Sequence, residues 1–174
     1  MELTTLIKNK IRDVPDFPKP GILFKDITPI LQDAAVFAKV VNAFAERYAP
    51  KKISDVVGVE SRGFIFGAAL AYKLGVAFVP VRKKGKLPYK TIETSYDLEY
   101  GSATIEMHID GVKKGSRVVV IDDLLATGGT AGATCELVEK CGGKIIECAF
   151  VVELAFLNGR GKLPGREIFS LVQY

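Results

Sequence analysis

The chain has 174 residues, of which 48% are hydrophobic. A chain of this length can bury one substantial core and is short for two, so we expect a single domain. The 24 basic residues exceed the 20 acidic residues by four, an excess too small to indicate nucleic-acid binding unless the charges form one stripe. The densest basic cluster, residues 82–86, suits a polyphosphate substrate equally well.

Cysteine spacing and hydropathy argue against a disulfide-rich, a zinc-binding and a membrane-spanning protein. The three cysteines, Cys135, Cys141 and Cys148, are odd in number and lack C-x-x-C spacing, which argues against a disulfide framework and against a zinc site. We expect them to be buried and reduced. No apolar run approaches the roughly 20 residues that span a bilayer, and the N-terminus lacks a signal peptide pattern. We therefore expect a cytoplasmic protein with neither a membrane nor a nucleic acid as partner.

The first third of the chain predicts two helices with a loop between them. Residues 3–13 place apolar side chains at helical spacing, and Val14 and Pro15 end this helix. Residues 16–29 contain three prolines and a glycine, which exclude a regular helix, while their large apolar side chains are untypical of a solvated linker. We expect a structured loop that covers something. Asp33 can cap the next helix, residues 34–48.

A charged turn follows the first predicted strand, residues 53–59. Glu60, Ser61, Arg62 and Gly63 lead directly into a helix from about residue 64 to residue 74. Ligands of open α/β sheets gather at the carboxyl ends of the strands, so Arg62 is placed to meet an anion. The alternative is a local ion pair between Glu60 and Arg62 at the surface.

A basic segment, residues 82–90, follows the strand predicted for residues 76–81. Alone, it is typical of a mobile solvated loop; beside a phosphate site it becomes a candidate lid. Residues 94–100 and 103–109 flank a Gly-Ser pair and predict a β-hairpin. The only histidine, His108, falls on the polar face of the second arm, where we expect it to be solvated and not catalytic.

The richest motif spans residues 118–130. Four β-branched residues predict a buried strand that ends at Asp122 and Asp123, and small residues then lead into a helix running from Thr130 towards Cys141. Paired glycines at a helix N-terminus let backbone N–H groups converge on a phosphate. The Walker lysine pattern and G-x-G-x-x-G are both missing, so a ribose 5-phosphate site is indicated. The alternative is an ordinary turn with solvated aspartates.

Strands are also predicted at residues 145–154 and 167–172. Because strands alternate with helices through the middle of the chain, we expect an α/β fold, a parallel sheet with helices on both faces.

These segments together resemble the adenine phosphoribosyltransferase family of type I phosphoribosyltransferases. The resemblance covers nearly the whole chain and rests on residues 17–29, 60–64, 82–88, 95–101 and 118–130. It implies one domain over residues 1–174, with an N-terminal hood (residues 1–32) and an α/β core (residues 33–174) that includes a flexible β-hairpin lid (residues 82–109).

The resemblance implies a transferase of purine salvage that converts adenine and 5-phosphoribosyl-1-pyrophosphate (PRPP) to AMP and pyrophosphate. It also implies a homodimer. Mg²⁺ is the implied cofactor, held through substrate and water near Asp122 and Asp123 with no direct protein ligand. The transition state would have oxocarbenium character at the ribose C1, so positive charge there and negative charge on the leaving pyrophosphate need stabilisation.

Residue roles follow from the same resemblance. The phosphate and ribose would contact Asp122, Asp123, Ala126, Thr127, Gly128, Gly129 and Thr130, although neighbouring strand residues point to opposite faces and one aspartate could be structural. The pyrophosphate would contact Glu60, Ser61, Arg62, Arg82, Lys83 and Lys86, and a non-proline cis peptide is expected between Ser61 and Arg62. Glu99 would be the acid/base for the adenine N7, with Tyr100 beside it and Arg62 as the third catalytic residue.

Adenine would lie under the hood, stacked on Phe24, with backbone groups of Leu23 and Lys25 reading its exocyclic amine. Lys25 stands where many members have arginine, which matters little if the backbone does the reading. Two alternatives are a transferase for another base, such as hypoxanthine, guanine or xanthine, and a regulator that binds PRPP without turnover. Regulators of this kind generally carry a DNA-binding domain, and no segment before Asp16 is long enough for a helix-turn-helix.

Overall fold

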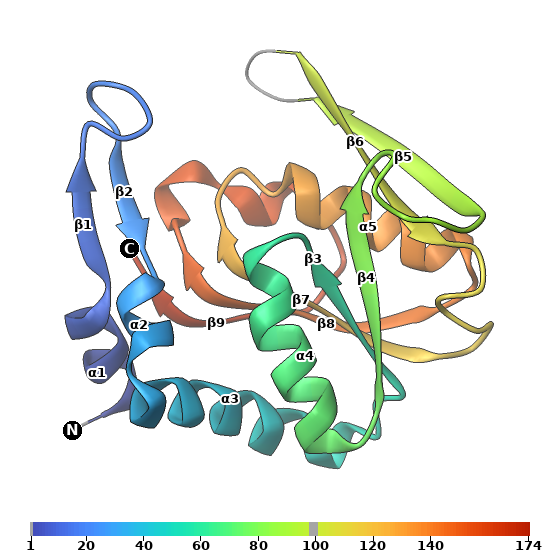
Figure 1. The fold of residues 1–174 in the computed structure, drawn as a ribbon, viewed down its shortest axis with the longest axis horizontal. Coiled ribbons are helices and arrows are strands. Elements are labelled where there is room, and N and C mark those ends of the chain that lie inside the picture. The colour runs from blue at the N-terminus through green and yellow to red at the C-terminus, as the bar shows by residue number, and fades with distance from the viewer. Residues whose placement is uncertain (1, 98–100) are drawn as a thin grey trace. The chain divides into compact units, whose positions relative to one another are not determined.

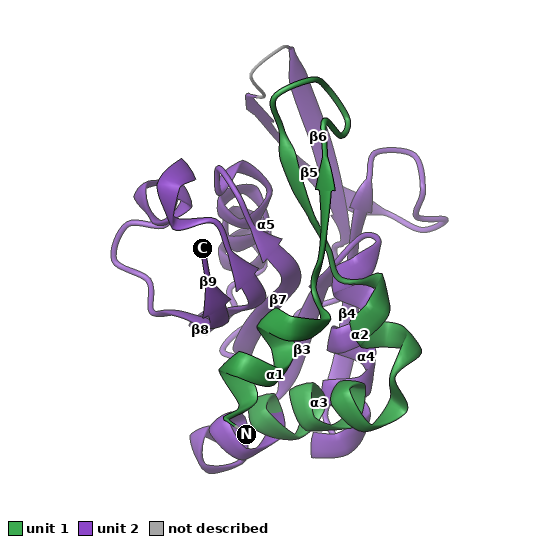
Figure 2. Cartoon of the chain, turned by 90° about the vertical axis from the view of Figure 1, so that its left-hand side faces the viewer, with its two compact units in different colours: residues 1–44 green, residues 45–174 purple. Residues whose placement is uncertain are grey.

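The computed structural model describes residues 2–97 and 101–174, which form two compact units divided within one helix, Met1–Phe44 and Ala45–Tyr174 (Figures 1 and 2). In the described part of the chain, no helix is both long enough and apolar enough to cross a bilayer. The hood boundary predicted at residue 32 stays a prediction.

The first unit combines short helices with a two-stranded ribbon. Its elements are α1 (Leu3–Lys10), β1 (Arg12–Pro15), β2 (Leu23–Asp26), α2 (Thr28–Gln32) and most of α3 (Ala34–Tyr48). The ribbon is antiparallel, with Val14 opposite Phe24. At its tip, Asp16 accepts a hydrogen bond of 2.7 Å from the backbone N–H of Gly21, whose φ of 85° suits glycine.

Two sequence predictions for this unit change and one is confirmed. The helix predicted over residues 3–13 ends at Lys10, because the next residues pair with β2. The region predicted as a loop contains both β2 and α2, and α2 tolerates Pro29 because a proline in the first turn of a helix lacks only an N–H that has no intrahelical acceptor. The cap of α3 is confirmed: Asp33 accepts hydrogen bonds from the N–H groups of Ala35 and Val36 at 3.1 Å.

The second unit is a seven-stranded sheet with a helix on each face. Its strands, helices and 3₁₀ turns are η1 (Ala49–Lys51), β3 (Asp55–Val59), α4 (Arg62–Leu74), β4 (Ala77–Lys83), β5 (Thr91–Asp97), β6 (Ser102–His108), β7 (Arg117–Leu125), α5 (Gly129–Lys140), β8 (Lys144–Glu153), η2 (Ala155–Leu157), η3 (Gly159–Lys162) and β9 (Ile168–Gln173). The sheet order is β5-β6-β4-β3-β7-β8-β9.

The sheet is mixed. The five strands from β4 to β9 in this order are parallel, as predicted, but the β5–β6 hairpin joins their edge because β6 pairs antiparallel with the end of β4. The two helices lie on opposite faces: Val118 and Val120 pack in the core that contains α5, whereas Ile121 faces Gly67 of α4. The hairpin rises from the sheet edge in Figure 1.

Strand β7 is longer than the sequence indicates. It was expected to end at the two aspartates, yet it continues to Leu125, because β8 runs beside it and pairs Asp122 with Phe150 and Leu125 with Glu153.

The buried thiols are confirmed for Cys135 and Cys148, and all three cysteines are free.

Candidate active site

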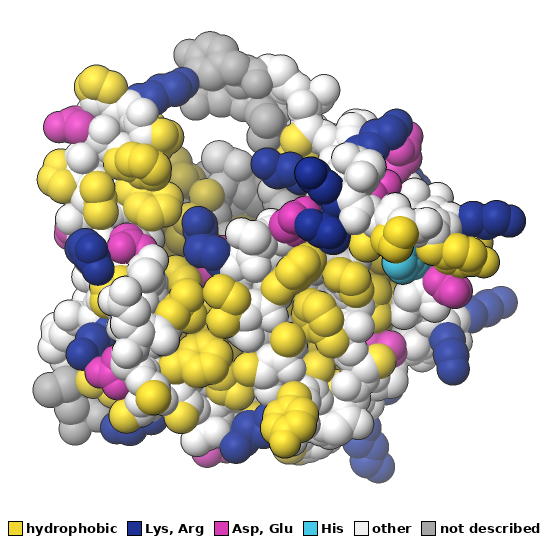
Figure 3. Space-filling view, viewed as in Figure 1, with side chains coloured by type: hydrophobic (Ala, Val, Ile, Leu, Met, Phe, Trp, Pro, Cys, Tyr) yellow, Lys and Arg dark blue, Asp and Glu magenta, His cyan; other side chains and the backbone are white. Residues whose placement is uncertain are grey.

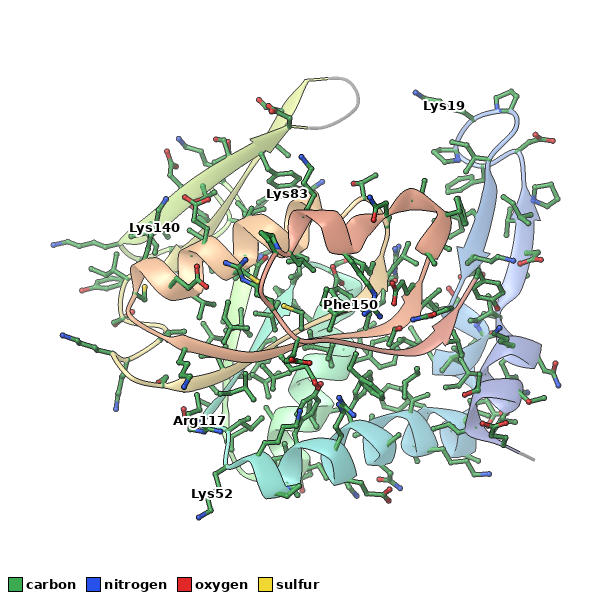
Figure 4. The ribbon with its side chains drawn as sticks, turned by 180° about the vertical axis from the view of Figure 1, so that it is seen from behind. Lys19, Lys52, Lys83, Arg117, Lys140 and Phe150 are labelled. Atoms are coloured by element: carbon green, nitrogen blue, oxygen red, sulfur yellow. The ribbon has the colours of Figure 1, made fainter. Side chains whose placement is uncertain are left out.

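A cavity of about 280 Å³ lies in the second unit at the carboxyl ends of β3, β4 and β7. Both charged motifs and the start of the basic segment line it: Val59, Glu60, Ser61, Arg62, Val81, Arg82, Lys83, Tyr96, Ile105, Asp122, Asp123, Leu124 and Thr130. Figure 3 shows basic side chains gathered around an acidic one below the hairpin. In Figure 4, Lys83 lies beside the hairpin, whereas Phe150 lies within the sheet. This lining favours the binding of an anion.

The turn from β3 to α4 holds one correction. The non-proline cis peptide lies between Glu60 and Ser61, not between Ser61 and Arg62 as expected. Helix α4 already begins at Arg62, and Ser61 has helical backbone angles (φ −110°, ψ −36°), so the Ser61–Arg62 peptide belongs to the first turn and is trans.

Arg62 is held by the acidic pair of β7. Its Nε donates to Oδ2 of Asp123 at 2.5 Å, and Asp123 is 5% exposed whereas the Arg62 side chain is 44% exposed. The local Glu60–Arg62 ion pair that the sequence left open is therefore not the arrangement adopted. Asp123 therefore holds the guanidinium of Arg62, and Arg62 lines the cavity.

Asp122 has a different environment from Asp123. Its Oδ1 accepts the backbone N–H of Asp123 at 2.8 Å, and a Cβ added to Gly63 would lie 2.8 Å from the same oxygen. Burial, followed by the neighbouring Asp123 carboxylate, raises the pKa of Asp122 well above its ordinary value. The two aspartates thus differ in their partners, as the opposite directions of neighbouring strand side chains led us to expect.

Glu60 organises the first part of the basic segment. Nη2 of Arg82 donates to its Oε1 at 2.6 Å, and the backbone N–H of Lys83 donates to its Oε2 at 3.2 Å. The hydrogen bond from Arg82 holds the pKa of Glu60 below its ordinary value. The Nε of Arg82 is buried and has no hydrogen-bond partner among the described residues. Glu60 therefore positions Arg82, while one donor of that guanidinium is left unsatisfied beside the cavity.

Glu106 is a site-supporting residue that sequence reasoning missed. The alternation of polar and apolar residues along the second hairpin arm predicts that Glu106 lies on the polar face. Glu106 is nevertheless only 4% exposed, and its Oε1 accepts hydrogen bonds from the backbone N–H groups of Lys86 and Leu87 at 2.9 Å each. Burial acts to raise its pKa, but bonds from three backbone N–H groups and from Thr91 lower it overall. The basic segment is therefore anchored to β6, an arrangement that contradicts the mobile-loop alternative for residues 85–87.

A second cavity of about 80 Å³ adjoins the first, and the two share Asp122, Leu124 and Thr130. It is lined by the whole predicted phosphate loop, namely Ala126, Thr127, Gly128, Gly129 and Thr130, together with Asp122, Leu124, Leu125 and Ala131. Gly128 has a φ of 82° and α5 starts at the next residue, so the positive end of the helix dipole meets this cavity. A phosphate fits the loop's chemistry.

Tyr96 is the second residue that the sequence analysis missed. Thr130 donates its hydroxyl hydrogen to the Tyr96 hydroxyl at 2.9 Å, and a Cβ on Gly129 would lie 2.9 Å from the Tyr96 ring. The hairpin strand β5 therefore contacts the phosphate loop directly.

The remaining predicted residues lie elsewhere. Glu99 and Tyr100 fall outside the described residues, between the ends of β5 and β6. Leu23, Phe24 and Lys25 form β2 of the first unit, where the Phe24 ring packs edge-on against Phe17 at 5.2 Å. The Lys25 Nζ donates to Asp13 at 2.6 Å.

His108 stays outside the cavity lining, although the expectation that it is solvated is wrong. It is half-buried, its ring packs edge-on against Tyr89 at 6.0 Å, and its Nε2 is buried without a partner in the described structure.

Known proteins resemble this chain over nearly its whole length. A family model, the phosphoribosyl transferase domain, matches residues 26–169. The adenine phosphoribosyltransferase of Syntrophotalea carbinolica is 60% identical over 168 residues, 97% of this chain and 98% of the relative. The crystal structure of adenine phosphoribosyltransferase from Thermoanaerobacter pseudethanolicus matches with a TM-score of 0.96 at 51% identity, over 99% of this chain and 100% of that chain.

A third relative was crystallised with ligands. The adenine phosphoribosyltransferase of Saccharomyces cerevisiae, complexed with D-2,5-dideoxy-2,5-imino-altritol 1,6-bisphosphate and adenine, has a TM-score of 0.94 at 43% identity, over 97% of this chain and 98% of that chain. The chain therefore belongs to the phosphoribosyltransferase family and, within it, to the adenine phosphoribosyltransferases.

Proposed function

We propose that the protein transfers the 5-phosphoribosyl group of PRPP to N9 of adenine and so forms AMP and pyrophosphate. The C1–oxygen bond to pyrophosphate breaks, the C1–N9 bond forms, and adenine loses one proton. The observation that carries the proposal is the pair of adjoining cavities. One is lined by residues 126–130, and the other by Arg62 of α4 and by Arg82 and Lys83 of β4. A phosphate at each end of one ribose matches this arrangement.

The smaller cavity would hold the ribose 5-phosphate half of the substrate. Backbone N–H groups of residues 126–130 and the Thr130 hydroxyl would bind the 5′-phosphate at the N-terminus of α5. Asp122, which lines both cavities, would address the ribose hydroxyls. We assign Asp123 to holding Arg62, because its Oδ2 is already engaged by that guanidinium.

The larger cavity would hold the leaving pyrophosphate. Arg62, Arg82 and Lys83 line it, and Lys86 lies in the segment anchored by Glu106. Ser61 lines the cavity from the turn before α4. Cations fixed before the reaction stabilise the charge that develops on the leaving group without reorganisation during the step. Glu60 would act as an anchor for Arg82 and not as a ligand of the pyrophosphate, since both its oxygens accept bonds.

Base recognition would come from the hood and the lid. The Lys25 ammonium is occupied by Asp13, which favours readout of the adenine amine by backbone groups of Leu23 and Lys25, with Phe24 stacked on the ring. An amine placed against a donor, or a 6-oxo group against an acceptor, leaves a buried group unsatisfied at about 1–3 kcal/mol. From the hairpin, Glu99 would exchange a proton with N7, and Tyr100 would lie beside the reacting centre.

Mg²⁺, a homodimer and a cytoplasmic location complete the proposal. The described residues contain no group of three or more His, Cys, Asp or Glu side chains that could hold a metal ion. Mg²⁺ would instead be bound through substrate phosphates and water, with Asp122, which lines both cavities, nearby, and it would neutralise phosphate charge. Light scattering of the purified chain tests the dimer.

The test of the function is a steady-state assay of nucleotide formation from PRPP and Mg²⁺ with adenine, hypoxanthine and guanine in parallel. We expect turnover with adenine alone and a large loss in Glu99→Ala. Turnover of the 6-oxo purines would contradict the proposed base recognition. PRPP binding without turnover of any base would instead indicate a regulator.

A further inference from the structure

We propose that the 3₁₀ segment Gly159–Lys162, locked by an ion pair between the exposed Arg160 and the buried Glu153, is a positioning brace for the loop that holds the 5′-phosphate of PRPP. This inference rests on the proposed function and adds residues about thirty positions beyond the phosphate motif. The brace is defined as residues 159–162, which form η3 in the second unit.

The first observation is backbone contact between the brace and the phosphate loop. A Cβ on Gly128 would overlap the carbonyl oxygen of Gly159, and a Cβ on Gly159 would overlap the carbonyl oxygen of Ala126. The Gly159 Cβ would also lie 3.0 Å from the Leu125 side chain. Because neither glycine has room for a side chain, the two backbones pack directly against each other where the loop turns.

The second observation is that the brace also contacts the start of α5. A Cβ on Gly132 would lie 3.1 Å from the carbonyl oxygen of Lys162, and the Cβ of Lys162 lies close to Gly128. The N–H of Gly132 donates to the carbonyl of Gly128 at 2.9 Å, within the first turn of the helix. The brace therefore contacts both the phosphate loop and the N-terminal turn of α5.

The third observation is how the brace is fixed. Nε and Nη2 of Arg160 donate to Oε1 and Oε2 of Glu153 at 2.6 and 2.8 Å. Glu153 is 3% exposed and also accepts bonds from Ser170 and Gln173 of β9, at 2.6 and 3.0 Å. A bidentate arginine–carboxylate pair with every acceptor used defines one geometry for the segment that carries it.

The pair is tied to the same strand end from which the loop departs. Glu153 is the last residue of β8 and lies opposite Leu125, the last residue of β7. The N–H of Leu154 donates to the carbonyl of Leu125 at 2.9 Å. The loop begins at the next residue, Ala126, so brace and loop share one origin and their relative position is set by the sheet.

Such a brace has a chemical use in this loop. Backbone N–H groups bind a phosphate well only when they converge on it, and the small residues of this loop allow many other conformations. A displacement of about 1 Å in a positioning group can cost up to about 100-fold in rate. Gly159 and Arg160 are therefore positioning residues that act through the loop and touch no reacting atom.

The decisive comparison is Gly159→Ala against Gly161→Ala. Both change one glycine of the brace to alanine, but a Cβ at Gly161 would meet only the side chain of Asn158, at 3.3 Å. We expect Gly159→Ala to raise the KM for PRPP about ten-fold or more with the KM for adenine unchanged, and Gly161→Ala to leave both within about two-fold. Equal rises of both KM values in Gly159→Ala would indicate general damage and overturn the proposal.

A second pair of variants covers poor folding of Gly159→Ala. Arg160→Ala removes the ion pair, and Arg160→Lys retains the charge and one possible hydrogen bond. We expect Arg160→Ala to weaken PRPP binding in calorimetry and Arg160→Lys to recover part of the affinity. Equal PRPP affinity in Arg160→Ala and the unchanged protein would count against the brace.

Amide hydrogen exchange of the unliganded protein separates this inference from the proposed reaction. We expect the N–H groups of residues 126–129 to exchange faster in Arg160→Ala than in Gly161→Ala, whichever substrate the enzyme uses. Unchanged exchange in this loop would refute the brace even if the enzyme turns over adenine. Faster exchange in a protein that does not turn over PRPP would support the brace and refute the reaction.

Discussion

Removing the charge of Glu147 is expected to destabilise the fold strongly, although Glu147 does not line either cavity. Glu147 lies in β8 and is 1% exposed. Its two oxygens accept bonds from Nε and Nη2 of Arg47 at 2.6 and 2.7 Å, from the Tyr48 hydroxyl at 2.7 Å and from the Lys51 ammonium at 3.0 Å. Arg47 also lies over the Phe169 ring, 3.9 Å from its centroid. A buried carboxylate with four donors is stabilising only while it is ionised.

The magnitude follows from the pKa of Glu147. Burial acts to raise this pKa, but the bonds from Arg47, Tyr48 and Lys51 outweigh burial and lower it from 4.5 to about 2. Because the pKa is lower in the folded state, the stability is present above pH 4.5 and is lost as the pH falls towards 2. The linkage corresponds to about 3 kcal/mol at pH 7 and about 2 kcal/mol at pH 3.5.

The assay is urea unfolding of Glu147→Gln at pH 7 and pH 3.5, with Glu46→Gln as the matched control. Glu46 is exposed on the same helix as Arg47, so its variant removes an equal charge at the surface. We expect Glu147→Gln to lose about 3 kcal/mol at pH 7, or about 6–12 °C in Tm, and visibly less at pH 3.5. Equal effects of the two variants, or a loss that does not shrink in acid, would refute the reasoning.

Three further variants test the site. Gly63→Ala places a Cβ 2.8 Å from the Asp122 carboxylate, so we expect kcat/KM to fall about ten-fold or more. An unchanged kcat/KM would show that the turn accommodates the added methyl group without displacing Asp122. Glu106→Gln weakens the bonds to two backbone N–H groups of the basic segment, so inhibition by pyrophosphate should weaken while the KM for adenine stays constant; an equal change in both would indicate general damage. Tyr96→Phe removes the acceptor of the Thr130 hydroxyl, and we expect a few-fold rise in the KM for PRPP; a fall would contradict the contact's role.

The centre of the parallel sheet was predictable because β3, β7 and β8 are largely buried on both faces. β3, β7 and β8 consist mostly of apolar residues. Such a run identifies a buried strand from its own sequence, even when the neighbouring strands are unknown. The cap of α3 was predictable for a similar reason, since Asp33 and the N–H groups that it accepts are at most three residues apart. Local chemistry also singled out the loop of residues 126–130 and the start of the basic segment, which line the two cavities.

Features that depend on distant partners were not predictable. β1 and β2 are short and partly exposed, and their pairing depends on a turn that brings Pro15 opposite Leu23. The burial of Glu106 depends on N–H groups about twenty residues earlier in the chain, whereas alternation alone assigns it to a polar face. Periodicity describes one element at a time and is silent on such contacts.

Ion pairing in the site shows the same limit. Sequence proximity left a Glu60–Arg62 pair open as an alternative, yet each residue bonds a partner on a different strand: Glu60 bonds Arg82 of β4, and Arg62 bonds Asp123 of β7. The exchange matters for function, because it makes Glu60 and Asp123 anchors and leaves the two arginines at the cavity. The residue roles assigned to the hairpin tip remain predictions.

The proposed reaction is tested most directly by ³¹P NMR of the purified protein with PRPP, Mg²⁺ and adenine. We expect the PRPP signals to be replaced by those of AMP and pyrophosphate in equal amounts, and the reaction to stop when adenine is omitted. Release of pyrophosphate without AMP, or equal nucleotide formation from hypoxanthine, would contradict it.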